Sequence, residues 1–93
     1  MGKMVQVPTT QFKKDIKRLN KSGRYQLGKL KIAMDLIAAN EPLPAKYVNH
    51  KLVGYENRWD CHIEGDWLLL YELDPTNDRV YWIRSGTHSD IFR

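Results

Sequence analysis

Cysteine is nearly absent from this sequence, whose one thiol belongs to Cys61. A single cysteine excludes an internal disulfide, and with it the disulfide-stapled scaffolds of small secreted proteins, and it fits a reducing compartment. Long apolar runs are absent too. The best one, residues 32–39, is interrupted by Asp35 and is far too short to span a bilayer. Residues 1–8 lack the apolar stretch of a secretory signal. We therefore expect a cytoplasmic protein that does not enter a membrane.

Repeats, low-complexity tracts and linkers are also missing from the 93 residues. A chain of this length has room for one hydrophobic core, so we expect a single domain over residues 1–93. Hydrophobic residues make up 42% of the sequence, which is ordinary for a globular chain and makes independent folding plausible.

The net charge of +4 conceals a difference between the two halves of the chain. Residues 1–40 contain nine Lys or Arg against two Asp, whereas residues 41–93 contain six Lys or Arg against nine Asp or Glu. A basic first half suggests a polyanionic or acidic partner, but a solvated helical surface has the same composition. Charge alone leaves both interpretations open.

The first half of the sequence predicts a short strand followed by two helices. Residues 5–7 form the strand, and Thr9 or Thr10 can cap a helix that ends at Gly23. A second helix is expected over residues 24–40, before a pair of prolines. In both helices apolar side chains recur at helical spacing. These apolar positions are Phe12, Ile16 and Leu19 in the first helix and Leu27, Leu30, Met34 and Ile37 in the second.

The second half predicts three strands joined by tight turns. Residues 58–63 alternate between apolar and polar side chains, and residues 67–73 are almost continuously apolar, as in a central strand buried on both faces. Residues 74–78 are a strong turn signal, and residues 79–84 form the third strand. Helices followed by strands favour an α+β fold, with the N-terminal strand and two helices packed on a small antiparallel sheet.

All three histidines lie in this second half, at His50, His62 and His88. Histidine is the side chain whose ordinary pKa suits proton transfer near neutral pH. His62 shares the polar face of its strand with Arg58 and Asp60. His50 lies in an irregular segment after the second helix, and His88 lies in a loop beyond the last strand. The order of elements therefore permits the three imidazoles to converge on the uncovered side of the sheet.

Four segments of this half form a distinctive pattern, and three of them contain one of the histidines. They are Pro42-Leu43-Pro44, Asn49-His50-Lys51-Leu52, Cys61-His62-Ile63-Glu64-Gly65-Asp66-Trp67-Leu68-Leu69-Leu70-Tyr71 and Arg84-Ser85-Gly86-Thr87-His88-Ser89-Asp90-Ile91-Phe92. Together with the basic first half, they resemble the YafQ-type toxins of the RelE/ParE superfamily of bacterial toxin–antitoxin systems. The resemblance covers essentially the whole chain.

The resemblance implies a RelE-like, microbial-RNase-like fold and a toxin of a type II toxin–antitoxin system. It implies an endoribonuclease that cuts messenger RNA in the ribosomal A site, without metal or other cofactor. It also implies a cognate DinJ-like antitoxin, with operator DNA bound only as part of the antitoxin complex. Position by position, the functional residues of the family fall on His50, His62, Asp66, His88 and Phe92, with Arg84 at a basic position.

The expected mechanism follows from the substrate, because RNA carries its own nucleophile, the 2′-hydroxyl. The protein then supplies a base, an acid for the leaving 5′ oxygen, and positive charge for the transition state. We expect His50 and His62, oriented by Asp66, to serve as the base and His88 as the acid, although these roles could be exchanged. Arg84 would hold the phosphate, Phe92 would stack on a base, and Lys13, Lys17 and Lys21 would meet ribosomal RNA.

Two other interpretations remain open at this stage. Three histidines and an aspartate could ligate zinc in a metal-dependent nuclease, although their spacing is not a compact motif of the His-Glu-x-x-His type. The superfamily also includes ParE-like toxins, which act on DNA gyrase without catalysis. Such a toxin would not depend on the set formed by His50, His62, Asp66 and His88.

Overall fold

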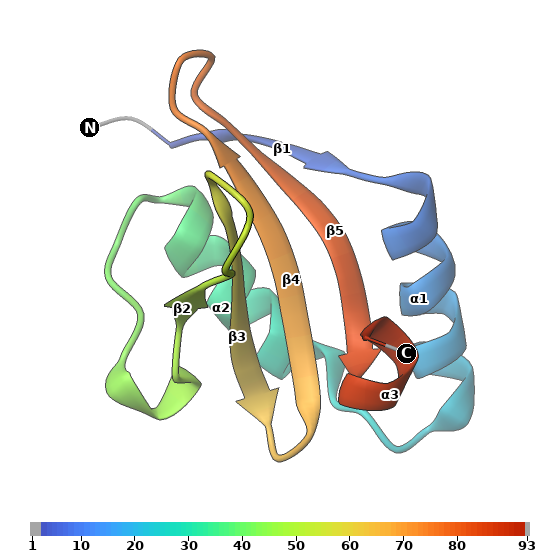
Figure 1. Cartoon of the computed structure of the whole chain (residues 1–93). Coiled ribbons are helices and arrows are strands. Elements are labelled where there is room, and N and C mark those ends of the chain that lie inside the picture. The colour runs from blue at the N-terminus through green and yellow to red at the C-terminus, as the bar shows by residue number, and fades with distance from the viewer. Residues whose placement is uncertain (1–2, 93) are drawn as a thin grey trace.

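The computed structural model describes residues 3–92, in which three α-helices and one 3₁₀ turn accompany a five-stranded sheet (Figure 1). In chain order the elements are β1 (Val5–Pro8), α1 (Thr10–Ser22), α2 (Leu27–Ala38), η1 (Ala45–Tyr47), β2 (His50–Lys51), β3 (Arg58–Glu64), β4 (Trp67–Asp74), β5 (Arg79–Thr87) and α3 (His88–Ile91). The predicted α+β class is confirmed. None of the helices in this described part is long and apolar enough to cross a membrane.

The sheet has the strand order β1-β5-β4-β3-β2 and is mixed. The three strands β3, β4 and β5 form the expected antiparallel meander, but β1 pairs with β5 in parallel. The expected small antiparallel sheet is thus formed by β2, β3, β4 and β5, and the parallel N-terminal strand makes the whole sheet mixed. The short segment Val5-Gln6-Val7 predicts a strand but carries no information about the neighbour it pairs with.

Helix α1 has the boundaries that its sequence signals predict. The hydroxyl of Thr9 accepts a hydrogen bond from the backbone N–H of Phe12, and Gly23 ends the helix with a φ of 71°. Helix α2 begins at Leu27 rather than at residue 24, because Gln26 before it is extended. It ends at Ala38, two residues before Asn40, whose φ is 59°.

The core lies between the helices and one face of the sheet, with α2 behind β3 and β4 in Figure 1 and α1 beside β5. Burial of apolar side chains in this layer is the main force that holds the fold together. Its largest fully buried side chain is Trp82 of β5, 1% exposed. Other members are Phe12, Leu19, Leu30, Ala33, Ile37, Cys61, Trp67, Leu69 and Tyr71.

Three short elements escaped prediction. Residues 48–52, expected to be irregular, contain the two-residue strand β2, so that His50 lies in a strand, and the 3₁₀ turn η1 precedes them. Strand β5 continues through residues 85–87, and His88 is the first residue of helix α3 instead of part of a loop. Each correction has a structural reason. β2 exists only through its pairing with β3, and α3 is a single turn held by a capping box between Thr87 and Asp90.

Candidate active site

The strand register places His50 and His62 on one face of the sheet. His50 is paired with Asp60, which is paired with Leu70, and Leu70 is paired with Arg84. Paired residues point to the same face, and so do residues two apart on one strand. His62 therefore shares this face with His50. Strand β2 and helix α3 lie on the viewer's side of the sheet in Figure 1, opposite α2.

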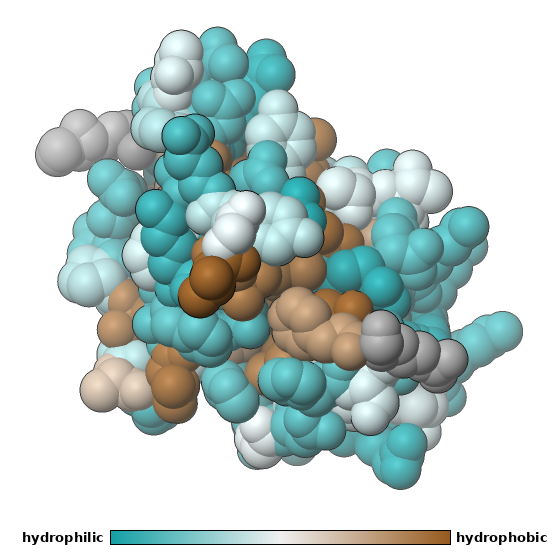
Figure 2. Space-filling view, in the orientation of Figure 1, coloured by the Kyte–Doolittle hydropathy of each residue, from teal (hydrophilic) through white to brown (hydrophobic). Residues whose placement is uncertain are grey.

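The surface on this side is mostly polar, but Figure 2 shows apolar atoms exposed in its middle. The exposed large hydrophobic side chains of the described residues include Val48, Val53, Tyr55 and Phe92. Phe92 follows α3 directly and is 41% exposed. An aromatic ring that is exposed beside histidines is available for stacking on a base.

His50 faces a buried carboxylate. Its Nδ1 lies 3.1 Å from Oδ1 of Asp60 and 3.2 Å from the carbonyl oxygen of Val48. The side chain of Asp60 is only 4% exposed, whereas that of His50 is 53% exposed. Apart from this ion pair, which requires a protonated His50, Oδ1 of Asp60 has no hydrogen-bond partner among the described residues. The alternation of residues 58–63 predicts that Asp60 lies on the polar face of β3 but does not reveal this pairing, which depends on β2.

Two features define the conformation of the segment before His50. Val48 has a φ of 46°, a left-handed conformation that is costly for a β-branched residue and that persists only where the surroundings enforce it. The hydroxyl of Tyr71 donates a 2.6 Å hydrogen bond to Oδ1 of Asn49. Burial raises the pKa of Tyr71, so its hydroxyl stays protonated and remains a donor. The imidazole of His50 is therefore presented from a fixed backbone.

The turn between β3 and β4 connects the other two histidines. Nδ1 of His62 lies 3.2 Å from the carbonyl oxygen of Gly65. Oδ1 of Asp66 lies 3.4 Å from the backbone N–H of His88. The expected orientation of His62 by Asp66 is thus replaced by orientation through Gly65, and the aspartate faces the start of α3. One turn therefore contacts both His62 and the residue that follows β5.

His88 and Phe92 lie at the two ends of α3, with ring centroids 5.0 Å apart and ring planes inclined by 46°. Each end of the single turn has its own hydrogen bonds. Thr87 Oγ1 accepts from the N–H of Asp90, whose carboxylate accepts from the N–H of Thr87, and the N–H of Phe92 donates to the carbonyl of His88. The helix therefore fixes the position of both rings together.

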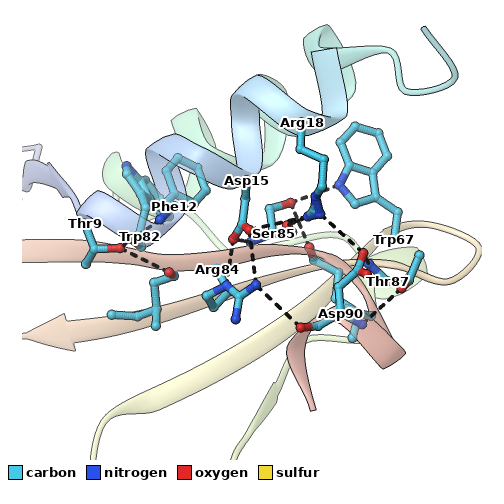
Figure 3. Close-up of polar contacts among 12 residues, drawn as sticks. Thr9, Phe12, Asp15, Arg18, Trp67, Trp82, Arg84, Ser85, Thr87 and Asp90 are labelled. Carbon is cyan, nitrogen blue, oxygen red and sulfur yellow. Dashed lines mark hydrogen bonds and ion pairs between the residues drawn. The ribbon is translucent and has the colours of Figure 1, made fainter. Parts of the chain in front are cut away.

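Arg84 is already engaged in an ion pair within the protein. Its Nε and Nη2 lie 2.8 Å and 3.1 Å from the two carboxylate oxygens of Asp15, which is buried on α1. The hydrogen bonds that the Arg84 guanidinium donates to Asp15 raise its pKa further above its usual value. Figure 3 shows the third guanidinium nitrogen pointing away from Asp15. Arg84 is 25% exposed and can offer that free edge to a phosphate.

The three lysines assigned to RNA binding are exposed along α1. Lys13, Lys17 and Lys21 follow one another at intervals of four residues, so they form a single row. The buried face of the same helix carries Phe12, Asp15 and Leu19. This row lies away from the core and is free to meet a polyanion.

Asp15 is a residue that the sequence analysis overlooked. It is the one acidic residue of α1, and it falls on the apolar face, three residues after Phe12 and four before Leu19. That position was the available signal, because a charged residue on an apolar face is buried only when it is paired.

Among residues 3–92, no group of three or more His, Cys, Asp or Glu side chains lies close enough together to hold a metal ion. Cys61 is buried, and burial together with the charge of Asp60 raises its thiol pKa to about 12. The thiol is therefore neutral and does not serve as a nucleophile at ordinary pH.

Residues 4–93 match the family described as the bacterial toxin YafQ of type II toxin–antitoxin systems. The chain belongs to the YafQ family. The mRNA interferase toxin YafQ of Escherichia coli K12 is 39% identical over 84 residues, which cover 88% of each chain. A putative toxin YafQ of Haemophilus influenzae is 33% identical and covers 85% of this chain and 82% of its own.

Solved toxin structures agree with this fold. The Escherichia coli DinJ–YafQ complex contains a chain with a TM-score of 0.87 and 35% identity, covering 97% of this toxin and 99% of that chain. A metal-bound toxin from Helicobacter pylori has a TM-score of 0.89 and 31% identity, covering 96% of this toxin and 99% of that chain. The predicted YafQ family and RelE-like fold are therefore confirmed.

Proposed function

We propose that this toxin is an endoribonuclease that cleaves messenger RNA in the ribosomal A site by attack of the 2′-hydroxyl on the adjacent phosphate. One observation carries the proposal. The exposed imidazole of His50 and the partly buried imidazole of His62 share one sheet face, and α3 brings His88 to the turn that follows His62. The name of the Escherichia coli relative, mRNA interferase, supports the same activity.

The contacts of the ring nitrogens suggest which histidines accept protons. Nδ1 of His50 faces a carboxylate and a carbonyl, and Nδ1 of His62 faces a carbonyl. All of these partners are acceptors, so the proton of each neutral ring belongs on Nδ1. Nε2 then carries a free lone pair, which is the form required of a general base. Asp60 would stabilise the imidazolium that forms at His50.

His88 completes the proposed mechanism as the general acid that protonates the leaving 5′ oxygen. It is exposed at the start of α3, and Asp66 holds its backbone. The free edge of Arg84 would contact the scissile phosphate, and Phe92 would stack on a base of the message. In general acid–base catalysis, a positioned acid or base such as each of these histidines accelerates the reaction by about 10²–10⁴-fold.

Partners follow from the surface charge and from the relatives. The lysine row of α1 would bind ribosomal RNA through phosphate contacts. A DinJ-like antitoxin would inhibit the toxin, as the solved DinJ–YafQ complex suggests, and operator DNA would be bound only through that antitoxin. The toxin would act in the bacterial cytoplasm.

Metal independence needs a direct experiment, because two similar solved structures are those of a metal-bound toxin and a copper-bound mutant toxin from Helicobacter pylori. Purified toxin is added to ribosomes that carry a defined message, and cleavage is mapped by primer extension. A transition-metal chelator is present in one arm, with free magnesium held constant. We expect unchanged cleavage within codons and products that end in a 2′,3′-cyclic or 3′ phosphate. Loss of cleavage that one added metal restores would establish a metal-dependent nuclease instead.

A further inference from the structure

The outer edge of β5 is only partly covered by another strand. β1 pairs with β5 from Arg79 to Trp82 and then ends. Beyond that point two charged side chains of α1 take the place of a strand at Ser85. The N–H of Ser85 donates a 3.0 Å hydrogen bond to Asp15, and its carbonyl accepts a 3.2 Å hydrogen bond from Arg18. Unpaired backbone groups at a sheet edge are thus satisfied by a helix.

Asp15 is the centre of this arrangement (Figure 3). Its side chain is 3% exposed and accepts from three residues. Besides Ser85, these are Arg84, through Nε and Nη2, and Arg18, through Nη2 at 3.4 Å. A buried carboxylate is tolerated only with such compensation, and here two guanidinium groups provide it.

The same residues reach helix α3. Arg18 lies 3.6 Å from the carboxylate of Asp90, and Nη2 of Arg84 lies 3.5 Å from the carbonyl of Asp90. Asp90 in turn caps Thr87, the residue before His88. A helix of one turn does not persist by itself, because forming the first turn is unfavourable. The position of α3 therefore depends on its contacts with Arg18 and Arg84.

Gly86 gives independent support for a close-fitting arrangement. A Cβ at Gly86 would lie 2.9 Å from Nη2 of Arg18 and 2.9 Å from Oδ2 of Asp90. Its φ of 157° is a backbone conformation that L side chains rarely adopt, so contact with neighbouring atoms and backbone conformation both disfavour a side chain here. The Arg18–Asp90 pair thus packs directly on the backbone of β5, immediately before the helix that carries His88.

We propose that Asp15 is a positioning residue of the active site, which fixes Arg84 and, through Arg18, the helix that presents His88 and Phe92. The proposal rests on the proposed ribonuclease function. Asp15 does not touch the substrate. Its effect is exerted on the orientation of three groups that do, so its loss should lower the rate of the bound complex more than the affinity for the ribosome.

Asp15→Asn is the decisive variant, because it keeps the volume and removes the charge. The new amide N–H₂ also faces the donors of Arg84, so one contact of the pair is lost. Asp35→Asn is the matched control, since Asp35 is an exposed helical aspartate that pairs with Lys31 only four residues away. Single-turnover cleavage on programmed ribosomes is measured over a range of toxin concentrations, which separates the plateau rate from the half-saturating concentration.

We expect Asp15→Asn to lower the plateau rate about tenfold or more, because small displacements of catalytic groups are costly. The half-saturating concentration should stay within about twofold of wild type. The active fraction of each preparation is determined by titration, so that partial unfolding does not count as a slower rate. A wild-type plateau rate, or a loss confined to the half-saturating concentration, overturns the proposal.

A spectroscopic measurement tests the same idea without relying on activity. Nuclear Overhauser contacts between the His88 and Phe92 rings, whose centroids are 5.0 Å apart, should weaken in Asp15→Asn and persist in Asp35→Asn. Unchanged ring contacts overturn the positioning role. If the wild-type protein itself fails to cleave ribosome-bound message, the proposed function fails, and this measurement still decides the structural claim.

A second variant covers the case in which Asp15→Asn does not fold. Asp90→Asn breaks the charge pair with Arg18 at a side chain that is 32% exposed and does not belong to the hydrophobic core. The Asn oxygen can still cap Thr87. We expect the same loss of plateau rate and ring contacts, to a smaller extent. A wild-type rate together with wild-type ring contacts in this variant overturns the proposal.

Discussion

His50 and Asp60 face each other across β2 and β3, with Nδ1 of the imidazole 3.1 Å from Oδ1 of the carboxylate. The histidine is half exposed and the aspartate is buried, so a fixed negative charge lies behind a ring that a substrate can reach. A carboxylate in this position holds a histidine in one tautomer and stabilises the imidazolium that forms when the ring accepts a proton. The arrangement suits a general base.

Asp60→Asn should therefore lower the single-turnover rate of message cleavage by about tenfold or more, because the imidazolium loses its counter-charge. Folding should be affected by no more than about 1 kcal/mol, since the Oδ1 that is altered makes no other hydrogen bond among the described residues. Rate and thermal melting are measured on one preparation, with Glu56→Gln in an exposed loop as the control. Wild-type cleavage by Asp60→Asn would show that the pair is not used in the reaction.

His88→Ala should separate catalysis from stability more sharply. His88 is exposed at the start of α3, so its truncation should change the free energy of unfolding by about 0.5 kcal/mol or less. Cleavage should fall about 10²-fold or more if the ring is the general acid. A much lower melting temperature would make His88 structural. An unchanged rate in a stable protein would favour a non-catalytic toxin of the ParE type.

Reversal of the α1 row, Lys13, Lys17 and Lys21 to Glu, should weaken binding to ribosomes without disturbing the core. The three side chains are exposed and point away from Phe12 and Leu19. Phosphate contacts make association fall steeply with salt, and the variant should lose part of that salt dependence. Sedimentation with ribosomes at two salt concentrations measures both effects. Equal binding by the two proteins at low and moderate salt would remove ribosomal RNA as the partner of this row.

Much of the fold could be predicted, because its main elements are encoded locally. The cap of α1 at Thr9, its end at Gly23, and the apolar run from residue 67 each act within a few residues of chain. The strand β2 and the helix α3 could not be predicted in this way. One needs its pairing with β3, and the other needs the contacts of Asp90 with Thr87 and with α1.

The residues of the candidate site could likewise be predicted, whereas their tertiary contacts could not. The sequence pattern identified the three histidines, Asp66, Arg84 and Phe92, because their residue types and order resemble those of a known family. It did not show what lies behind them. Asp60 faces His50 only through the register of β2, and Asp15 meets Arg84 across 69 positions of sequence. Contacts that depend on tertiary pairing leave little trace in a single sequence.

The raised pKa of the buried Cys61 thiol predicts that the free energy of unfolding depends on pH. Burial, reinforced by the charge of Asp60, raises its pKa from the usual 9.0 to about 12. Below pH 9 the thiol is protonated in both the folded and the unfolded chain, and its contribution to stability is fully present. Between the two pKa values only the unfolded chain releases the proton, so the free energy of unfolding should fall as pH rises.

The share of Cys61 in this loss is about 1.4 kcal/mol between pH 8 and pH 10, from one proton over the last pH unit. Urea unfolding under reducing conditions measures the loss, and the range ends at pH 10 because Tyr71, whose pKa burial raises above its usual 10.0, is already half ionised at that pH in the unfolded chain. Cys61→Val is the matched variant, since valine is similar in size and suits a strand. Between pH 8 and pH 10, the free energy of unfolding of this variant should fall by about 1.4 kcal/mol less than that of the wild type. An identical pH dependence in the two proteins would mean that the thiol does not ionise differently on folding.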